Sequence, residues 1–221
     1  MVAWGQNQGG RPRSAAAAGP VSKLLQTLRE ETNPDQAVRD VRTIWETDRW
    51  FTFPKFEETA KNVAAILRRA GLEDVEIGNP PADGVTQGGF WTLPLAWDVK
   101  AGTLEIVEPP APAGLRVLAD YQKVPTSIGM WSGPTPPGGV IAEVVLASGD
   151  VQNRDLKGKL VLGGRGSKVA LAKAGALGII SENTENRDLA DERGWINSFG
   201  DNGWSFTKGS TPLVSFSITP R

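Results

Sequence analysis

Residues 160–181 constrain the fold of this chain most, because they hold two short apolar runs on either side of a short helical pattern. The runs at 160–162 and 177–181 lack the polar alternation of a half-exposed strand, which is typical of strands buried on both faces. The Ala- and Leu-rich stretch between them favours a helix that Gly175 ends. A strand, a helix and a second strand within so short a segment predict a crossover and therefore a parallel pair.

Upstream of this unit, apolar residues recur at helical spacing. The pattern predicts helices at 23–31, 34–50 and 56–70, followed by a strand at 74–77. We expect Ser22 to cap the first helix and Asn33, with Pro34 behind it, to cap the second. Gly71 suits the left-handed position after the third helix, where Leu72 could fold back in a Schellman ending.

From about residue 90 onward the pattern shortens, and Gly and Pro cluster at 78–94, 108–114 and 132–139. Further strands are predicted at 91–99, 103–107, 115–118, 140–146 and 212–218. In the last of these, odd-numbered residues 213–217 alternate with Val214, Phe216 and Ile218, which predicts two different faces. The expected class is α+β, with a disordered linker at 1–20, an N-terminal segment at 21–97 and a β-rich domain at 98–221.

The chain contains no His and no Cys among its 221 residues. Ser-His-Asp and Cys-His arrangements and zinc sites with His or Cys ligands are therefore impossible within it. Net charge is −1 with no basic run, so no electrostatic footprint for nucleic acid is present. No apolar stretch approaches the roughly 18 residues of a spanning helix, and Met1–Val21 lacks the apolar core of a signal peptide.

The remaining candidate sites have simpler structural interpretations, and no catalytic, cofactor-binding or metal-ligating residue is assigned. Ser167 and Lys168 are adjacent, which provides no geometry for a catalytic dyad on a helix. The segment 163–168 departs from a P-loop because Ser, not Gly, precedes Lys168, so we interpret it as a turn. A carboxylate hydrolase based on Asp98 and Asp120 would need a separation that sequence cannot show.

An acidic loop follows the crossover, and its spacing fits no EF-hand. We expect a solvated loop with Arg187 and Arg193 as partners, leaving open a carboxylate-only Ca²⁺ or Mg²⁺ site. Its acids are Glu182, Glu185, Asp188, Asp191 and Glu192.

Eight Trp against one Tyr is an unusual aromatic composition. Trp is costly to expose, so most of these side chains are expected in the core or at an interface with another domain. The same expectation holds for Trp131 and for the aromatic residues of the Gly/Asn-rich stretch 194–206, although such a loop can also be a binding surface. Those aromatics are Trp195, Phe199, Trp204 and Phe206.

Residues 140–183 resemble a protease-associated (PA) domain. The resemblance rests on DLKGKLVL at 155–162, the Gly-rich turn at 163–166 and AKAGALGIISEN at 172–183. It extends weakly over roughly 98–221 and implies a small β-rich accessory domain with one short strand-helix-strand crossover.

Residues 42–77 are similar to the opening of co-catalytic di-zinc aminopeptidases of the aminopeptidase Y and glutamate carboxypeptidase superfamily. In that family the catalytic half follows an inserted PA domain and supplies the ligands of two zinc ions. No position here matches a metal-ligand motif, so the resemblance implies a parent zinc peptidase whose catalytic half is not in this sequence. It also implies an extracytoplasmic or secreted protein.

The expected function is therefore a non-catalytic segment that shapes substrate access to a neighbouring catalytic domain or mediates contacts with a peptide or protein. A free-standing interaction or ligand-binding module without a catalytic partner is the alternative. The first hypothesis predicts an exposed apolar face near residues 34–70 and the terminal strand, whereas the second predicts a closed polar surface.

Overall fold

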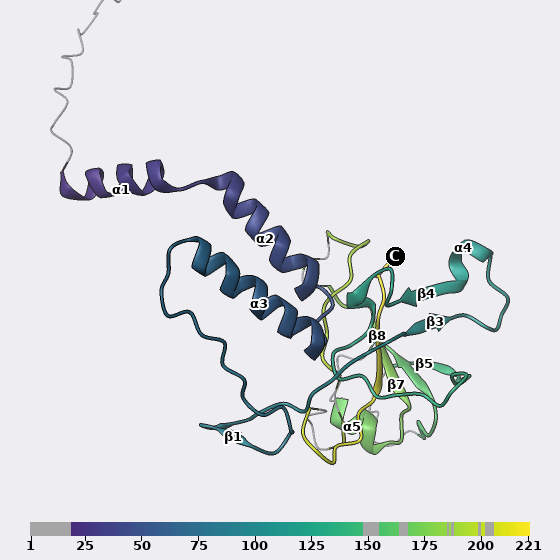
Figure 1. Ribbon diagram of the computed structural model, residues 1–221. Helices are drawn as coiled ribbons and strands as arrows, with labels where there is room; N and C mark the ends of the chain where they lie inside the picture. The colour runs from purple at the N-terminus through teal and green to yellow at the C-terminus, as the bar shows by residue number, and fades with distance from the viewer. Residues whose placement is uncertain are drawn as a thin grey trace, which may run out of the picture. The chain divides into compact units, whose positions relative to one another are not determined.

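The computed structural model describes residues 19–147, 155–163, 168–184, 186, 188–198, 200–201 and 206–221 (Figure 1). The chain forms two compact units, Met1–Arg42 and Thr43–Arg221, which we describe separately. Within the described residues, helices coexist with three β-sheets, so the predicted α+β class is confirmed. In the described residues, no helix is long and apolar enough to cross a membrane.

Three helices open the chain: α1 (Pro20–Glu31), α2 (Pro34–Asp48) and α3 (Phe53–Arg69). The predicted cap at Asn33 is confirmed, since its Oδ1 accepts the backbone N–H of Gln36 at 3.0 Å. The predicted cap at Ser22 is wrong. Gly19 occupies the cap position, because Pro20 has no N–H to satisfy and suits the first helical turn.

The predicted Schellman ending of α3 is confirmed. Gly71 has a φ of 88°. The N–H of Leu72 donates to the carbonyl of Leu67 at 3.1 Å, and the N–H of Gly71 donates to the carbonyl of Arg68 at 3.0 Å. The predicted strand after it is wrong. Residues 74–77 pair with no strand, and the carbonyl of Val75 accepts the Arg68 guanidinium instead at 2.7 Å.

The end of α2 packs against the start of α3 through buried hydroxyl groups. The Oγ1 atoms of Thr47 and Thr59 lie 2.7 Å apart, and Thr59 also bonds the Lys55 carbonyl at 3.0 Å. Because Thr59 is only 6% exposed, these bonds satisfy polar groups that would otherwise be costly to bury.

Two small antiparallel sheets follow. β1 (Gln87–Gly88) pairs with β2 (Trp91–Thr92), and β3 (Thr103–Glu105) pairs with β4 (Val117–Asp120). The strand predicted at 91–99 is therefore only two residues long, and the one predicted at 115–118 is displaced by a helical turn, α4 (Ala113–Arg116). A 3₁₀ turn, η1 (Pro125–Ser127), follows β4.

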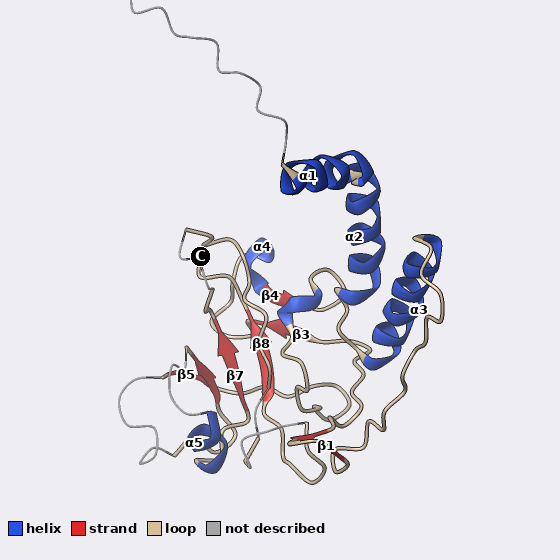
Figure 2. Cartoon of the chain, turned by 90° about the vertical axis from the view of Figure 1, so that its left-hand side faces the viewer, coloured by secondary structure: helices blue, strands red, loops and turns tan. Residues whose placement is uncertain are grey.

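The main sheet is parallel throughout, in the order β5 (Val144–Leu146), β6 (Leu160–Leu162), β7 (Gly178–Ser181) and β8 (Val214–Ser217). Helix α5 (Lys168–Lys173) connects β6 to β7 (Figure 2). The predicted crossover and parallel pair are confirmed. The strand predicted at 140–146 begins only at Val144.

The two faces of the main sheet carry two separate cores. Leu160, Ile180 and Phe216 pack with Leu104 of β3 and Ala119 of β4 on one face. On the other face Val161, Ile179 and Leu213 pack with Leu156 and with Leu171 of α5. The alternation predicted for 213–218 is confirmed, since Val214 and Phe216 join the core that includes Leu104, whereas Leu213, immediately before β8, joins the core on the other face.

Serine side chains fill the remaining positions of β8. Ser215 Oγ donates to Ser198 Oγ at 2.9 Å, and Ser198 Oγ donates to the Leu213 carbonyl at 2.6 Å. Ser217 Oγ donates to the Gly194 carbonyl at 2.7 Å. These bonds attach the loop at 194–198 to the sheet.

The boundary predicted near residue 97 stays a prediction. Contacts do cross it: the Tyr121 hydroxyl donates to the Trp50 carbonyl at 3.1 Å, and Phe53 N–H donates to the Trp97 carbonyl at 3.0 Å.

A pH-dependent contribution to stability is expected at Asp83, which closes the loop before β1. Its carboxylate accepts the hydroxyl and N–H of Thr86 and the N–H of Val85, and these bonds lower its pKa to about 2. The stabilisation is present above the ordinary Asp pKa near 4 and disappears as pH falls towards about 2. The destabilisation caused by Asp83→Asn should therefore be larger at pH 5 than at pH 2 in denaturant unfolding. An equal effect at both values would contradict this prediction.

Candidate functional site: an aromatic cleft

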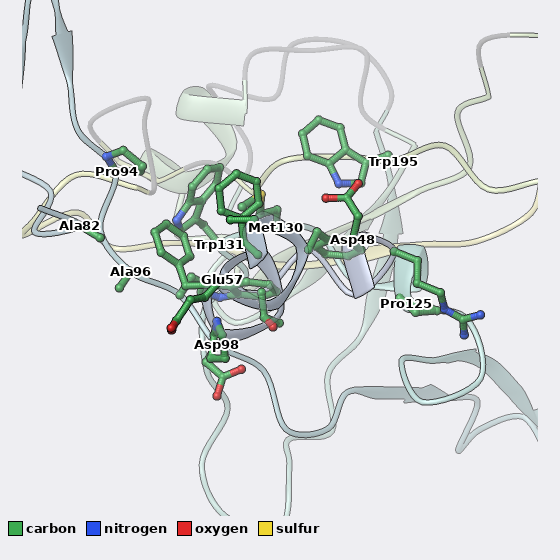
Figure 3. Close-up of a pocket in the computed structure, with 18 of the residues that line it drawn as sticks. Asp48, Glu57, Ala82, Pro94, Ala96, Asp98, Pro125, Met130, Trp131 and Trp195 are labelled. Carbon is green, nitrogen blue, oxygen red and sulfur yellow. The ribbon is translucent and has the colours of Figure 1, made fainter. Parts of the chain in front are cut away.

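A cleft of about 1430 Å³ lies in the unit Thr43–Arg221, between the α2–α3 corner and the loops around the main sheet (Figure 3). We call it the aromatic cleft. It draws on segments far apart in the sequence, from the end of α2 to the loop before β8. Its aromatic lining comprises Trp45, Phe51, Phe53, Phe56, Trp97, Trp131 and Trp195, and its prolines are Pro54, Pro80, Pro81, Pro94 and Pro125.

The α2–α3 corner forms one wall of the aromatic cleft. Phe51 adopts a positive φ of 38°, an uncommon conformation for a bulky residue. Its ring stacks on Trp97 with centroids 6.1 Å apart and meets Tyr121 edge-on at 6.4 Å. Burial, with the charge of Asp98, raises the pKa of Tyr121 to about 12. Aromatic packing and backbone bonds together hold this wall in place.

Trp131 also lines the aromatic cleft, and its backbone has a positive φ of 59°. Its indole N–H donates to the Leu95 carbonyl at 2.9 Å, and its ring packs against Phe206 with centroids 5.3 Å apart. The Trp97 indole N–H donates to the Ser132 carbonyl at 3.3 Å. Both indoles are thus oriented by bonds to backbone carbonyls, which leaves their apolar rings to shape the cleft.

Part of the aromatic lining is exposed. Trp45 is 53%, Trp195 53% and Phe56 64% exposed. Exposed aromatic side chains gathered around one hollow are unusual in a surface without a partner, and such patches mark interaction sites.

The cationic side chains that line the aromatic cleft make contacts within the protein, but Arg49 Nε and Arg193 Nη1 are buried without a hydrogen-bond partner. The Arg49 guanidinium lies over the rings of Trp45 and Trp50, at 4.7 and 5.0 Å from their centroids. Lys123 pairs with Asp120 at 3.2 Å. Arg193 donates to the Leu118 carbonyl at 3.1 Å, and burial lowers its pKa.

The acidic side chains of the lining are mostly not paired. Glu57 pairs with Lys61, and the pair lowers the pKa of Glu57. Within the described part of the chain, Asp48, Asp98 and Glu192 form no ion pair. Figure 3 shows Asp48, Glu57 and Asp98 distributed around the cleft rather than gathered at one point. Among the residues placed by the structure, no group of three or more potential ligands could hold a metal ion.

The structure brings some of the sequence candidates to this cleft and places others elsewhere. Lys168 begins α5, and burial lowers its pKa, while Ser167 and most of the turn 163–168 fall outside the described residues. Asp98 lines the cleft, but Asp120 is absent from the lining and pairs with Lys123.

The acidic loop is exposed where it is described. The prediction that Arg193 pairs with its acids is wrong. Arg193 bonds a carbonyl of β4 rather than an acid, and Asp191 pairs with Arg221 at 3.2 Å. Glu185 and Arg187 are outside the described residues. Of this loop's described residues, Glu192 and Arg193 line the aromatic cleft.

Four of the six described tryptophans line the aromatic cleft: Trp45, Trp97, Trp131 and Trp195. Phe206 packs behind Trp131, whereas Phe199 and Trp204 fall among the residues not described. Sequence reasoning singled out Trp131 and Trp195 but missed Trp45, Phe56 and Trp97. Their helical or strand-like spacing indicated core positions, and the only available signal was the excess of tryptophan.

The fold and site together define an α+β protein with an open aromatic cleft, exposed carboxylates and, in the described residues, no metal-ligand cluster. The sequence matches no protein-family model, and neither the curated proteins nor the solved structures include a match to it.

Proposed function

We propose that this chain is a non-catalytic polypeptide-binding module of a secreted zinc aminopeptidase-like hydrolase. In this proposal the aromatic cleft holds a peptide or protein segment and so shapes access to a catalytic domain, or mediates protein contacts. The two zinc ions and their ligands belong to the parent enzyme's catalytic half, as the sequence resemblance implies.

The aromatic cleft is the observation that carries the proposal. Its volume of about 1430 Å³ exceeds the roughly 300–1,000 Å³ of small-molecule sites, which favours a polymeric ligand. Tryptophan is over-represented among residues that dominate binding energy at protein interfaces. Proline-rich walls add rigid apolar surface that loses little entropy when a ligand binds.

The exposed side chains near residues 34–70 support a module with a neighbouring domain. Val38 and Val41 are 60% and 65% exposed, and Phe56 is 64% exposed. The first hypothesis also predicted an exposed apolar face near the terminal strand. This prediction is wrong, because every residue of β8 is buried. A buried terminal strand favours the second candidate, a free-standing interaction module, which would use the same cleft without a catalytic partner.

Binding should depend on the exposed tryptophan of the aromatic cleft. Twelve-residue peptides selected by phage display on the immobilised chain are labelled with fluorescein and titrated by anisotropy. Trp195→Ala should weaken binding about tenfold or more, as expected for an aromatic residue that anchors a partner. Trp91→Ala is the matched control, since Trp91 is 59% exposed but does not line the cleft. It should change affinity less than about twofold.

Two outcomes would reject the proposal. If no peptide binds, or if both tryptophan variants lose affinity equally, the cleft is not the binding site. If the purified chain hydrolyses an aminoacyl-4-nitroanilide in a zinc-dependent way, the module is not non-catalytic.

A further inference from the structure

We propose that the β1–β2 hairpin is a membrane-contact site, whose tip inserts Phe90 and Trp91 into the surface of a zwitterionic lipid bilayer. Neither side chain lines the aromatic cleft, so this membrane contact is independent of the proposed peptide binding.

The hairpin presents two aromatic rings to solvent. Strands β1 and β2 pair antiparallel and leave Gly89 and Phe90 in the turn between them. Phe90 is 88% exposed, the highest value for a large apolar side chain in the described part of the chain, and Trp91 is 59% exposed. Their ring centroids lie 5.4 Å apart, so they form one apolar tip at the outer edge of the ribbon (Figure 1). Exposed apolar side chains gathered in this way mark an interaction site.

The hairpin carries no charged side chain. Residues 84–97 contain no Asp, Glu, Lys or Arg. Charges lie at its base, where Asp83 precedes Gly84 and the backbone N–H of Lys208 donates to the Gly84 carbonyl at 3.1 Å. One acid and one base provide no net attraction for an anionic surface, whereas an uncharged tip matches the neutral surface of a zwitterionic bilayer.

The polar groups next to the tip already have partners within the hairpin. A group that enters a bilayer loses its hydrogen bonds to water, which is costly unless the protein replaces them. The side-chain amide of Gln87 donates to the Thr92 hydroxyl at 2.9 Å and to the Val85 carbonyl at 3.3 Å. The pairing of Gly88 with Trp91 closes the hairpin behind the turn. The tip can therefore leave water without exposing these groups to lipid unpaired.

The two aromatic residues suit different depths of a bilayer surface. Trp is enriched at the level of the lipid headgroups, where its ring is buried and its N–H meets an acceptor. Within the described residues the indole N–H of Trp91 has no hydrogen bond, so it is available to a lipid ester or phosphate oxygen. Phe90 has no polar group and suits the boundary with the acyl chains. A fluid lipid surface also accepts a protruding tip without a matching pocket.

Vesicles of dioleoylphosphatidylcholine and the full chain test this membrane contact. A single small anchor binds weakly, on the order of 10⁴ M⁻¹ for one myristoyl chain, so co-sedimentation titrations should extend to about 5 mM lipid. Phe90→Ala with Trp91→Ala should lower the partition constant at least about tenfold. Replacing about 30% of the lipid by phosphatidylserine, or raising NaCl from about 50 to about 500 mM, should change it less than about twofold.

The matched control is Trp45→Ala with Phe56→Ala. It removes the same two residue types from exposed positions in the aromatic cleft. The control should keep the partition constant within about twofold of the wild-type value, but it should weaken binding of the phage-selected peptides. The hairpin variant should show the reverse pattern.

The absence of Cys from the chain permits a second measurement. Phe90→Cys provides a single thiol for an environment-sensitive nitrobenzoxadiazole label. Vesicles should shift the emission of this label to shorter wavelength, and a nitroxide lipid should quench it. The same label at Leu115→Cys, a position that is 65% exposed in α4, should show neither change.

Four outcomes would overturn the membrane contact. The first is that the wild-type chain does not sediment with phosphatidylcholine vesicles or sediments only with those that contain phosphatidylserine. The second is that the hairpin variant binds vesicles like the wild type, and the third is that both double variants lose binding equally. The fourth is a concentration-dependent dimer in sedimentation velocity without lipid that the hairpin variant abolishes, because a second copy would then cover the tip. Vesicle binding without any peptide binding rejects only the proposed function.

Discussion

Gly178→Ala should destabilise the protein by at least about 2 kcal/mol, because the main sheet has no room for a methyl group at this position. Gly178 begins β7 and is buried beside β8. A Cβ added there would overlap the carbonyl oxygen of Val214 and lie 2.9 Å from the Val214 Cβ. The carbonyl belongs to the backbone of β8, so the clash cannot be relieved by a side-chain rotation. Urea unfolding followed by tryptophan fluorescence measures the loss.

Gly114→Ala is the matched control for this variant. Gly114 lies in the helical turn α4, and a Cβ added there would meet nothing within 4 Å. Alanine favours helix over glycine, so the control should leave stability unchanged or raise it by up to about 1 kcal/mol. If Gly178→Ala unfolds at the same urea concentration as the wild type, the close approach of β7 and β8 described here is wrong.

Leu171→Ala should cost about 2–5 kcal/mol of unfolding free energy. Leu171 is the fully buried side chain of α5, at 1% exposure, and packs with Val161, Ile179 and Leu213 on one face of the sheet. Truncation removes apolar contacts and leaves a cavity among residues that backbone pairing holds in place. The measurement is the shift in urea midpoint at unchanged slope.

The control for Leu171→Ala is Leu115→Ala, the same substitution on another short helix, α4. Leu115 is 65% exposed, so the expected effect is below about 0.5 kcal/mol. Similar losses for the two leucines would show that α5 does not cover the sheet as described.

Much of the local structure could be predicted, because it depends on neighbours in the chain. Asn33 caps α2 through an N–H three residues away, and Gly71 ends α3 in the left-handed region that glycine tolerates. The strand-helix-strand crossover was predictable because a short helix lies between two apolar runs. Such a short helical connection predicts that the two strands are parallel neighbours in one sheet.

Elements that need a distant partner were predicted less well. Residues 74–77 have strand-like composition, but no strand among the described residues pairs with them. The predicted strand at 91–99 reduces to Trp91–Thr92, and the backbone beyond it bonds loops instead, as Leu95 does with Phe206 at 2.7 Å. The composition of a segment cannot show whether another strand lies beside it.

The aromatic cleft could be predicted only as an excess of tryptophan. Periodicity placed Phe56 on the apolar face of α3, and that placement says nothing of what covers the face. The structure leaves Phe56 exposed at the cleft, whereas Ala64 on the same helix is 3% exposed. The difference lies in the tertiary neighbours of each residue.

Two glycines illustrate what sequence alone determined and what required the tertiary structure. Gly71 was assigned correctly because its role, a left-handed residue after a helix, involves only backbone a few residues away. Within its apolar run, nothing in the sequence distinguishes Gly178 from another small residue. Its importance comes from Val214 of β8, the strand that the parallel sheet brings beside it. Local conformation is encoded by short-range sterics and hydrogen bonds, but close packing depends on which distant segments meet.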